Sequence, residues 1–128
     1  MRLLLDTHIA LWAATAAPQL SQAAARLIDD PANEIHVSTV SLWEIGIKAG
    51  LGKLPLTATQ ASAMFDLCGY QSLALAKSHA RTLDGLAMNA DHKDPFDRML
   101  VAQALTEGMT LLTADAKMMA YRPTARLV

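Results

Sequence analysis

Apolar residues occur in short blocks that end at polar or acidic positions, and these blocks predict alternating strands and helices. Residues 3–5, 35–38 and 110–113 have the length and composition of buried strands; 72–74 and 126–128 are shorter candidates, the latter for an edge strand. Helices are predicted over residues 8–14, 21–29, 40–50, 57–67, 78–87 and 95–107, with a short one after Asp115. Alternating strands and helices predict an α/β domain with a short, mainly parallel sheet.

Several of these boundaries carry residues that favour a helix end. Thr57 and Ser78 are predicted N-caps, since a side-chain oxygen can accept from a free amide of the first turn. Asp94 is a further N-cap, followed by Pro95 at the first helical position. Gly108 is expected to end the helix that Pro95 begins.

Composition narrows the class of protein. The 128 residues suit one domain over 1–128, and 52% apolar against 18% charged residues indicates a packed core. The net charge is −1, from 11 Lys and Arg against 12 Asp and Glu. Nucleic-acid binding would therefore need a local basic patch or a metal ion. Aromatic residues make up only 5%, so base-stacking platforms are not expected.

The cysteine count and the lengths of the apolar runs indicate the redox chemistry and the cellular location. A single cysteine, Cys68, cannot form an intramolecular disulfide, and its apolar helical surroundings predict a buried, inert thiol. No apolar run reaches the length of a membrane span, and residues 2–6 are too short for a signal peptide. We therefore expect a cytoplasmic protein without membrane association.

Two aspartates follow directly on apolar strands. Asp6 ends the block LLLD and Asp115 ends TLLTAD. Each can serve as an N-cap for the helix that follows. In a parallel sheet, however, the carboxyl ends of the strands share one edge, where open α/β folds bind ligands. Asp6 and Asp115 are thus expected to lie near one another at that edge.

Two further acids lie on predicted helices. On a helical wheel Glu44 lies beside the apolar arc of Val40, Trp43 and Ile47, although an exposed pair with Lys48 is the simpler interpretation. Asp97 shares an arc with buried-type residues at a helix start, which makes it the better chemical candidate; Asp94 acts mainly as a cap. Converging acids repel one another unless a cation neutralises them, and carboxylates are preferred ligands of Mg²⁺ and Mn²⁺.

Four blocks of the chain, LLLDTHIALW, VSTVSLWEIGIK, HKDPFDRMLVAQAL and TLLTADAKMMAY, occur in an order that resembles PIN-domain proteins, and more narrowly VapC-type toxins of bacterial toxin–antitoxin pairs. The resemblance implies a PIN-like three-layer α/β/α domain and a Mg²⁺-dependent endoribonuclease, with Mn²⁺ as an alternative ion. Matched by motif, the catalytic residues, called the four acids below, are Asp6, Glu44, Asp97 and Asp115. Asp6 and Asp97 would be the main metal ligands, supported by Thr7, Ser41, Asp94 and Thr113.

The same resemblance implies an RNA substrate, a cognate antitoxin and a homodimer. Trp43 and the apolar surface of helix 40–50 are the expected dimer contact. Arg98 is a candidate phosphate contact, with Lys48 and Lys93 as weaker ones. For the histidines near the acids we favour structural roles, a helix-facing side chain for His8 and an exposed loop residue for His92, because a metal-activated water needs no histidine base.

Two other functions are compatible with parts of this pattern. A regulatory interaction module with a PIN-like fold and no nuclease activity would use its acids only as helix caps. A phosphatase with Asp6 as nucleophile would resemble the haloacid-dehalogenase-like enzymes, but these place a second acid two residues later, where this chain has His8. Metal-dependent RNA cleavage separates the nuclease from both alternatives.

Overall fold

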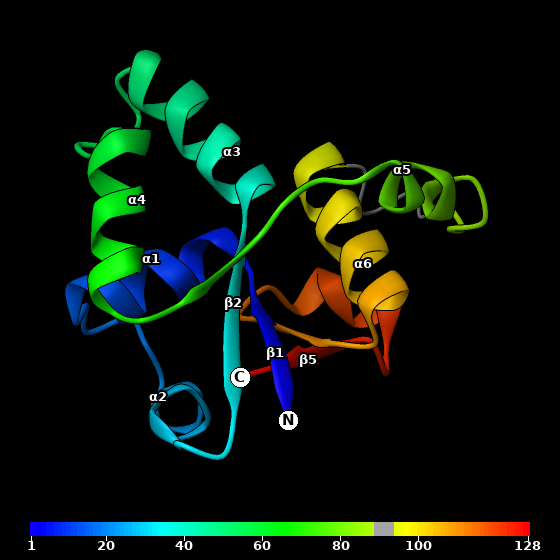
Figure 1. Cartoon of the computed structure of the whole chain (residues 1–128), viewed down its shortest axis with the longest axis horizontal. Coiled ribbons are helices and arrows are strands. Elements are labelled where there is room, and N and C mark those ends of the chain that lie inside the picture. The colour runs from blue at the N-terminus through cyan, green and yellow to red at the C-terminus, as the bar shows by residue number, and fades with distance from the viewer. Residues whose placement is uncertain (89–93) are drawn as a thin grey trace.

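The protein is described here by a computed structural model that covers residues 1–88 and 94–128. Within these residues five strands form one sheet in the order β3-β2-β1-β4-β5, and every neighbouring pair is parallel (Figure 1). The strands are β1 (Arg2–Leu5), β2 (Glu34–Ser38), β3 (Gln71–Leu73), β4 (Thr110–Thr113) and β5 (Ala125–Leu127). The predicted parallel α/β class is confirmed, with β5 as an edge strand.

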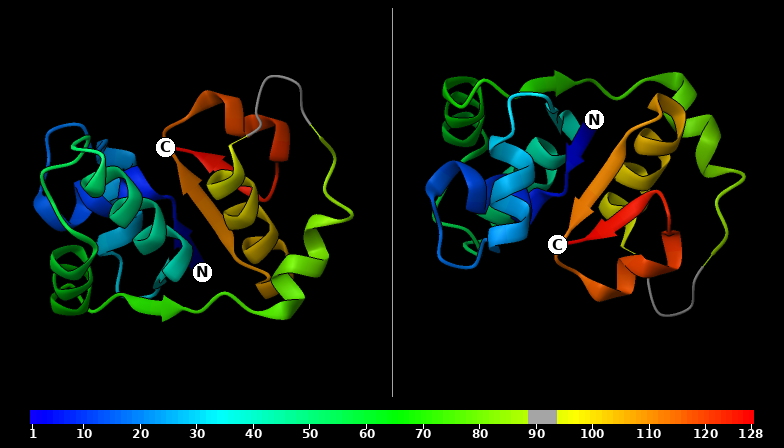
Figure 2. Two further views of the ribbon diagram at one scale, coloured as in Figure 1. Left: turned by 90° about the horizontal axis from the view of Figure 1, so that it is seen from above. Right: turned by 90° about the horizontal axis from the view of Figure 1, so that it is seen from below.

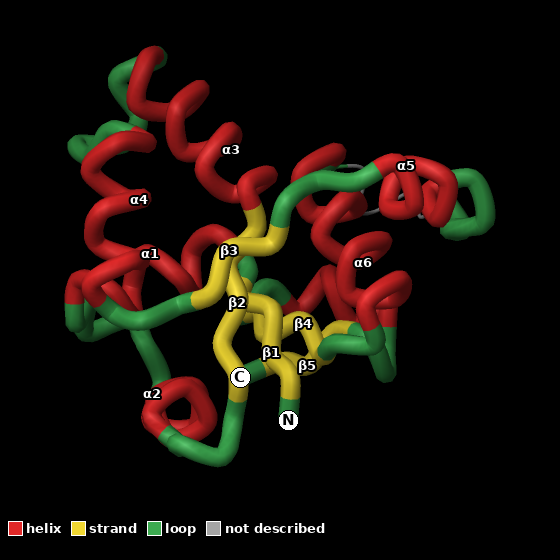
Figure 3. The backbone as a smooth tube through the Cα atoms, viewed as in Figure 1, coloured by secondary structure: helices red, strands yellow, loops and turns green. Residues whose placement is uncertain are grey.

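Helices cover both faces of the sheet and give a three-layer α/β/α domain (Figures 2 and 3). One face carries α1 (Thr7–Thr15), α2 (Gln22–Asp29) and α4 (Ala58–Leu67). The other carries α5 (Lys77–Leu83), α6 (Pro95–Glu107) and the short 3₁₀ helix η1 (Ala116–Tyr121). Helix α3 (Thr39–Gly50) continues from β2 beyond the sheet and packs beside α4 (Figure 1).

The strand β1 shows why two cores form. Leu3 and Leu5 lie in the core under α1, α2 and α4, while Leu4 lies in the core under α6. Successive side chains of a strand point to opposite faces, so an unbroken apolar run fits a strand that is buried on both sides. All three leucines have no exposed surface, which accounts for the unalternating LLL block.

A buried polar chain ties the α6 layer to the carboxyl end of β2. The Ser38 hydroxyl donates to Gln103 Oε1 (2.5 Å) and accepts from the Val40 amide at the start of α3. Gln103 Nε2 lies 3.3 Å from His79 Nδ1, and His79 Nε2 lies 3.2 Å from Glu107 Oε1. Buried polar groups need such partners, so this chain fixes α3, α5 and α6 relative to one another.

The sequence expectations for the ends of α5 and for the burial of Cys68 are wrong. Ser78 is not the N-cap of α5; the cap is Ala76, whose amide donates to His79 Nδ1, and the helix ends at Leu83 rather than residue 87. The His79 ring accepts from the amide of the N-cap residue, as Glu or Gln does at this position of a capping box, and residue preferences do not predict this use of histidine. Cys68 is exposed rather than buried, because α4 ends at Leu67 and leaves the thiol on the surface before the turn at Gly69.

Within residues 1–88 and 94–128, no helix combines the length and apolar character that a membrane span requires.

Candidate active site

The carboxyl ends of β1 and β4 lie on adjacent strands, and an aspartate follows each of them. Asp6 comes directly after β1, and its amide donates to Leu112 O of β4 (3.0 Å). Asp115 follows β4 and caps η1 by accepting from the Lys117 amide (3.0 Å). The two aspartates line one pocket of about 350 Å³. The parallel topology therefore brings Asp6 and Asp115 to the same edge of the sheet, as the sequence led us to expect.

Asp6 is a buried carboxylate with a defined orientation. Its Oδ1 accepts from the Ile9 amide (2.9 Å), so it caps α1 as well as facing the pocket. Burial raises its pKa; hydrogen bonds from Ile9 and Thr113 and the nearby His8 act in the opposite direction, and the charge of Glu44 raises the pKa further. Thr113, which is fully buried, thus supports Asp6 directly.

Glu44 is held from two sides. The Thr7 hydroxyl donates to Glu44 Oε1 (2.6 Å) and also lies 3.0 Å from the Ser41 hydroxyl. Lys48 Nζ contacts Glu44 Oε2 at 2.5 Å. The expected Glu44–Lys48 pair therefore forms, but the expectation that it is exposed is wrong, since Glu44 is only 4% exposed. Contact with Thr7 of α1 buries its carboxylate, which a wheel of α3 alone cannot show.

The pKa of Asp97 is affected by the other acids of the site. Its pKa is raised to about 7, first by burial and then by the negative charges of Asp94, Asp6, Glu44 and Asp115. Burial alone raises the pKa of a carboxyl group, but the additional effect of negative charges requires that other carboxylates are near, because charge effects weaken with distance and screening. Asp6, Glu44 and Asp115, which come from three other parts of the chain, therefore lie near enough to act electrostatically on Asp97 at the carboxyl edge of the sheet.

Asp94 has the structural role expected for it. Its carboxylate accepts from the Asp97 amide (3.0 Å) as N-cap of α6, Pro95 follows at the first helical position, and Gly108 ends the helix with a positive φ of 67°. Asp94 is exposed, and its charge still contributes to the raised pKa of Asp97.

The donor set fits a hydrated divalent cation. Among the described residues, no three acidic, histidine or cysteine side chains lie close enough to ligate one ion together. Mg²⁺ usually keeps several waters and takes one or two protein carboxylates, so it needs no closed cage of side chains. After burial, the negative charges of neighbouring carboxylates raise the pKa of Asp97 further, and a cation bound among them would relieve this repulsion.

The guanidinium group of Arg98 forms hydrogen bonds with the segment after α5. Nη1 donates to Ala87 O (2.9 Å) and to the Tyr121 hydroxyl (3.3 Å), while Nη2 donates to Leu86 O (3.2 Å). These bonds direct Arg98 toward η1 and the end of α5. A contact with phosphate remains a prediction for this residue. Lys93 and His92, the other residues named above before Asp94 in the sequence, lie outside the described residues.

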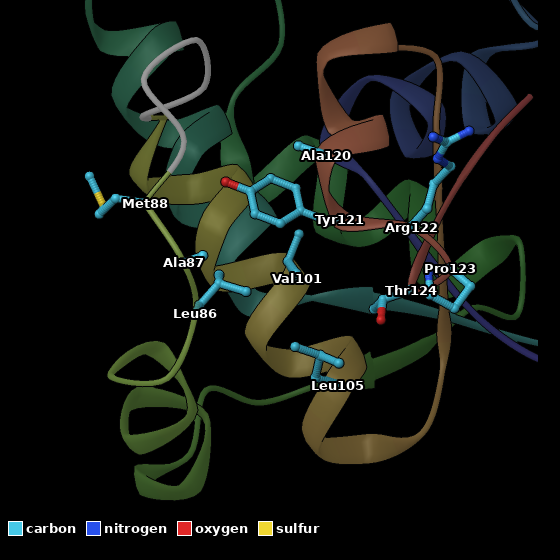
Figure 4. A pocket seen from close by; sticks show the side chains of 10 residues that line it. All are labelled: Leu86, Ala87, Met88, Val101, Leu105, Ala120, Tyr121, Arg122, Pro123 and Thr124. Carbon is cyan, nitrogen blue, oxygen red and sulfur yellow. The ribbon is translucent and has the colours of Figure 1, made fainter.

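Arg98 lies next to a second pocket, of about 530 Å³, between α6 and η1 (Figure 4). Its lining is mostly apolar, with Leu86, Val101, Leu105 and the ring of Tyr121 around the opening. None of the four acids lines it, so it is separate from the acidic site.

Sequence reasoning missed one feature of the acidic pocket. Besides Asp6, Ala114 and Asp115, the pocket is lined by His8 and Trp12, whose ring centroids are 5.8 Å apart. The side chain of His8 is exposed rather than helix-facing, so that expectation is wrong. The available signal was the i, i+4 spacing of His8 and Trp12 directly after Asp6, which places both rings on one face of α1.

The fold and the site together define a class of protein. It is a parallel α/β domain with a group of acids at the carboxyl edge of its sheet. The PIN domain family model matches residues 3–122, so the chain belongs to the PIN domain family. Over 120 residues it is 29% identical to Ribonuclease VapC22 of Mycobacterium tuberculosis, covering 93% of this chain and 91% of that protein.

Solved structures agree with this fold. A structure of VapBC2 from Rickettsia felis bound to a promoter DNA fragment contains a chain with a TM-score of 0.64 and 20% identity, covering 100% of this chain and 98% of the other. A chain of VapBC-1 from nontypeable Haemophilus influenzae has a TM-score of 0.63 and 18% identity. The match covers 100% of this chain and 97% of the other. At such identities the likeness shows the fold.

Proposed function

We propose that the protein is a Mg²⁺-dependent endoribonuclease and the toxin of a type II toxin–antitoxin pair, with Mn²⁺ as an alternative ion. The observation that carries the proposal is the presence of Asp6, Glu44 and Asp115 near Asp97, whose pKa is raised to about 7 by burial first and then by neighbouring negative charges that include these three. The relative named as a ribonuclease and the structural neighbours from toxin–antitoxin complexes support it.

Each residue of the site has a proposed task. Asp6 and Asp97 would be the main metal ligands, with Glu44 and Asp115 completing the negative charge. A divalent ion bound there supplies an activated water and offsets charge on the leaving 3′ oxygen of the RNA. Thr7 and Ser41 orient Glu44, Thr113 orients Asp6, and Asp94 holds the first turn of α6.

Lys48 supplies a positive charge in direct contact with one of the four acids. Its ammonium group contacts Glu44 Oε2, which neutralises part of the charge that the four acids concentrate. Lys48 would hold Glu44 in place and would lower the repulsion that an approaching RNA phosphate meets. Phosphate contacts from Lys48 or Arg98 are secondary parts of the proposal.

The proposed assembly has three partners. RNA is the substrate, a second copy of the chain packs against α3, and a cognate antitoxin blocks the acids with a basic side chain, for which arginine is the best geometric match to carboxylates. We place the protein in the cytoplasm and treat residues 1–128 as one PIN domain.

Carboxylate-to-amide variants test the mechanism. Asp6→Asn and Asp97→Asn should lower RNA cleavage by more than about a hundredfold, since loss of an outer-shell partner already costs about 10–100-fold at metal sites. Asp94→Asn is the matched control: Asn caps a helix almost as well, so a loss of about tenfold or less is expected. Cleavage is measured with purified protein and single-stranded RNA in Mg²⁺ and in EDTA.

Three outcomes would change this assignment. Loss of activity in Asp94→Asn with tolerance of Asp97→Asn would reverse the roles of these two residues. Cleavage that persists in EDTA would rule out the metal mechanism. Absence of RNA cleavage with any divalent ion would instead favour the regulatory module.

A further inference from the structure

The acidic pocket contains aromatic rings as well as carboxylates. Asp6 and Asp115 line it together with His8, Trp12 and Ala114, and its volume is about 350 Å³. This volume lies in the range of small-molecule binding sites. Elsewhere in the described chain, Trp43 pairs with Phe96 and Phe65 pairs with Tyr70, and neither pair lines this pocket. Trp12 and His8 are thus placed where a ligand of the acids would meet them.

The two rings are held by the helix that Asp6 begins. Asp6 caps α1, and Trp12 lies six residues further along, about 9 Å by helix rise. The indole is half-buried and packs against the core of α1, α2 and α4, so its position is anchored, while His8 is exposed. Their ring planes are tilted by 43° at 5.8 Å between centroids. A fixed, partly open ring needs little ordering when a flat ligand binds.

Charge determines how a nucleotide would enter this pocket. The carboxylates repel a phosphate unless a cation lies between them, but they repel an uncharged base far less. A nucleotide would therefore place its phosphate on the cation side, near Asp6, and its base on the side of the rings. Aromatic side chains stack on unpaired bases of any sequence, since every base has a π-face.

We propose that Trp12, assisted by His8, forms a stacking subsite for the base of the nucleotide next to the phosphate that is cut in single-stranded RNA. The inference rests on the proposed nuclease function and deepens it. It assigns a binding role to Trp12 and makes the site selective for unpaired RNA, because a base inside a duplex is already stacked and paired.

Kinetics of Trp12 variants provide the first test. Trp12→Leu should raise the KM for a single-stranded RNA about tenfold, which corresponds to about 1.4 kcal/mol and lies within the contribution of one stacked base. The kcat should change by less than about twofold, since the ring binds the base and takes no part in bond cleavage. Trp12→Phe should rescue the KM, because a ring that can stack is restored.

Tyr70→Leu is the matched control for packing. It removes an aromatic ring that packs against the same core but does not line the acidic pocket, so its KM should stay that of the wild type. Melting temperatures of all variants are measured in parallel. A folded Trp12→Leu protein with unchanged KM would overturn the proposal, and so would a Tyr70→Leu protein with the same rise in KM. An effect of Trp12→Leu confined to antitoxin binding would also overturn it.

Fluorescence provides a second test that does not depend on cleavage. The chain has two tryptophans, so Trp43→Phe leaves Trp12 as the single reporter. At saturating Mg²⁺, a short single-stranded RNA whose backbone linkages resist hydrolysis should quench its emission, while a duplex of the same sequence and a polyphosphate of matched charge should not. Equal quenching by polyphosphate, or none by RNA, contradicts stacking. If the wild type cuts no RNA, the nuclease proposal fails, and this titration alone decides the stacking site.

Discussion

Burial and neighbouring negative charges together raise the pKa of the Asp97 carboxyl group. Its pKa rises to about 7, compared with 3.8 in a free chain. A group with a raised acidic pKa binds its proton more tightly in the folded state than in the unfolded state. Folding is therefore favoured by Asp97 at low pH, and this contribution is lost as pH rises from about 4 through about 7 in the absence of a divalent ion.

The variant Asp97→Asn removes this titration. In EDTA it should be more stable than the wild type at pH 8, by on the order of 1 kcal/mol once solvent screening is allowed for, with the difference disappearing near pH 4. Urea unfolding at both pH values measures it. Asp94→Asn keeps a helix cap and leaves the Asp97 carboxyl in place, so its stability should still fall with pH in this window. A pH-independent effect of Asp97→Asn would contradict the assigned cause.

Helix α3 is the element that presents an apolar surface outward. Trp43 is 60% exposed, Ile47 41% and Leu51, at the end of the helix, 64%. The i, i+4 spacing places them in one stripe, while Val40 and Ile45 of the same helix are buried. Trp43 also packs edge-on against Phe96 of α6, with 5.1 Å between ring centroids. An exposed stripe with an aromatic anchor suits a protein interface.

A charge placed in this stripe should separate the proposed homodimer. Ile47→Glu should give a monomer at micromolar concentration, because burying an unpaired carboxylate in an apolar interface is costly. Leu67→Glu is the control, since Leu67 is 90% exposed on α4 and lies outside the stripe. Sedimentation equilibrium measures the mass. A wild-type protein that is already monomeric, or dissociation by Leu67→Glu alone, would contradict an interface on α3.

At the scale of the whole molecule, a bound cation would stabilise the fold, because the four acids come from β1, α3, α6 and the end of β4. Mg²⁺ at a hundred times its Kd should add about 2.7 kcal/mol to the free energy of unfolding. For a chain of this length that is a rise of several degrees in Tm. The rise should be smaller at pH 6 than at pH 8, because protons compete for Asp97 below about pH 7.

Differential scanning calorimetry with and without Mg²⁺ measures this gain. Asp6→Asn and Asp97→Asn should lose most of it, while Asp94→Asn should keep it. An equal rise in Tm in all three variants would show that the ion stabilises the protein at some other place.

The sequence by itself determined the features that depend on neighbours along the chain. Strand blocks such as LLL, and caps such as Asp94 with Pro95, follow from side-chain preferences within one turn or one strand, and they were predicted correctly. The meeting of Asp6 and Asp115 was also expected, because parallel strands bring their carboxyl ends to one edge whatever the details of packing.

Only the tertiary structure decided the features that depend on contacts between distant residues. Thr7 buries the carboxylate of Glu44 across 37 positions of sequence, so the pattern of α3 alone wrongly predicted an exposed pair with Lys48. The pKa of Asp97 depends on charges from three other parts of the chain, and Trp12 joins the acidic pocket only because α1 packs beside β4. Burial and charge act through space, and local residue preferences carry no information about those distances.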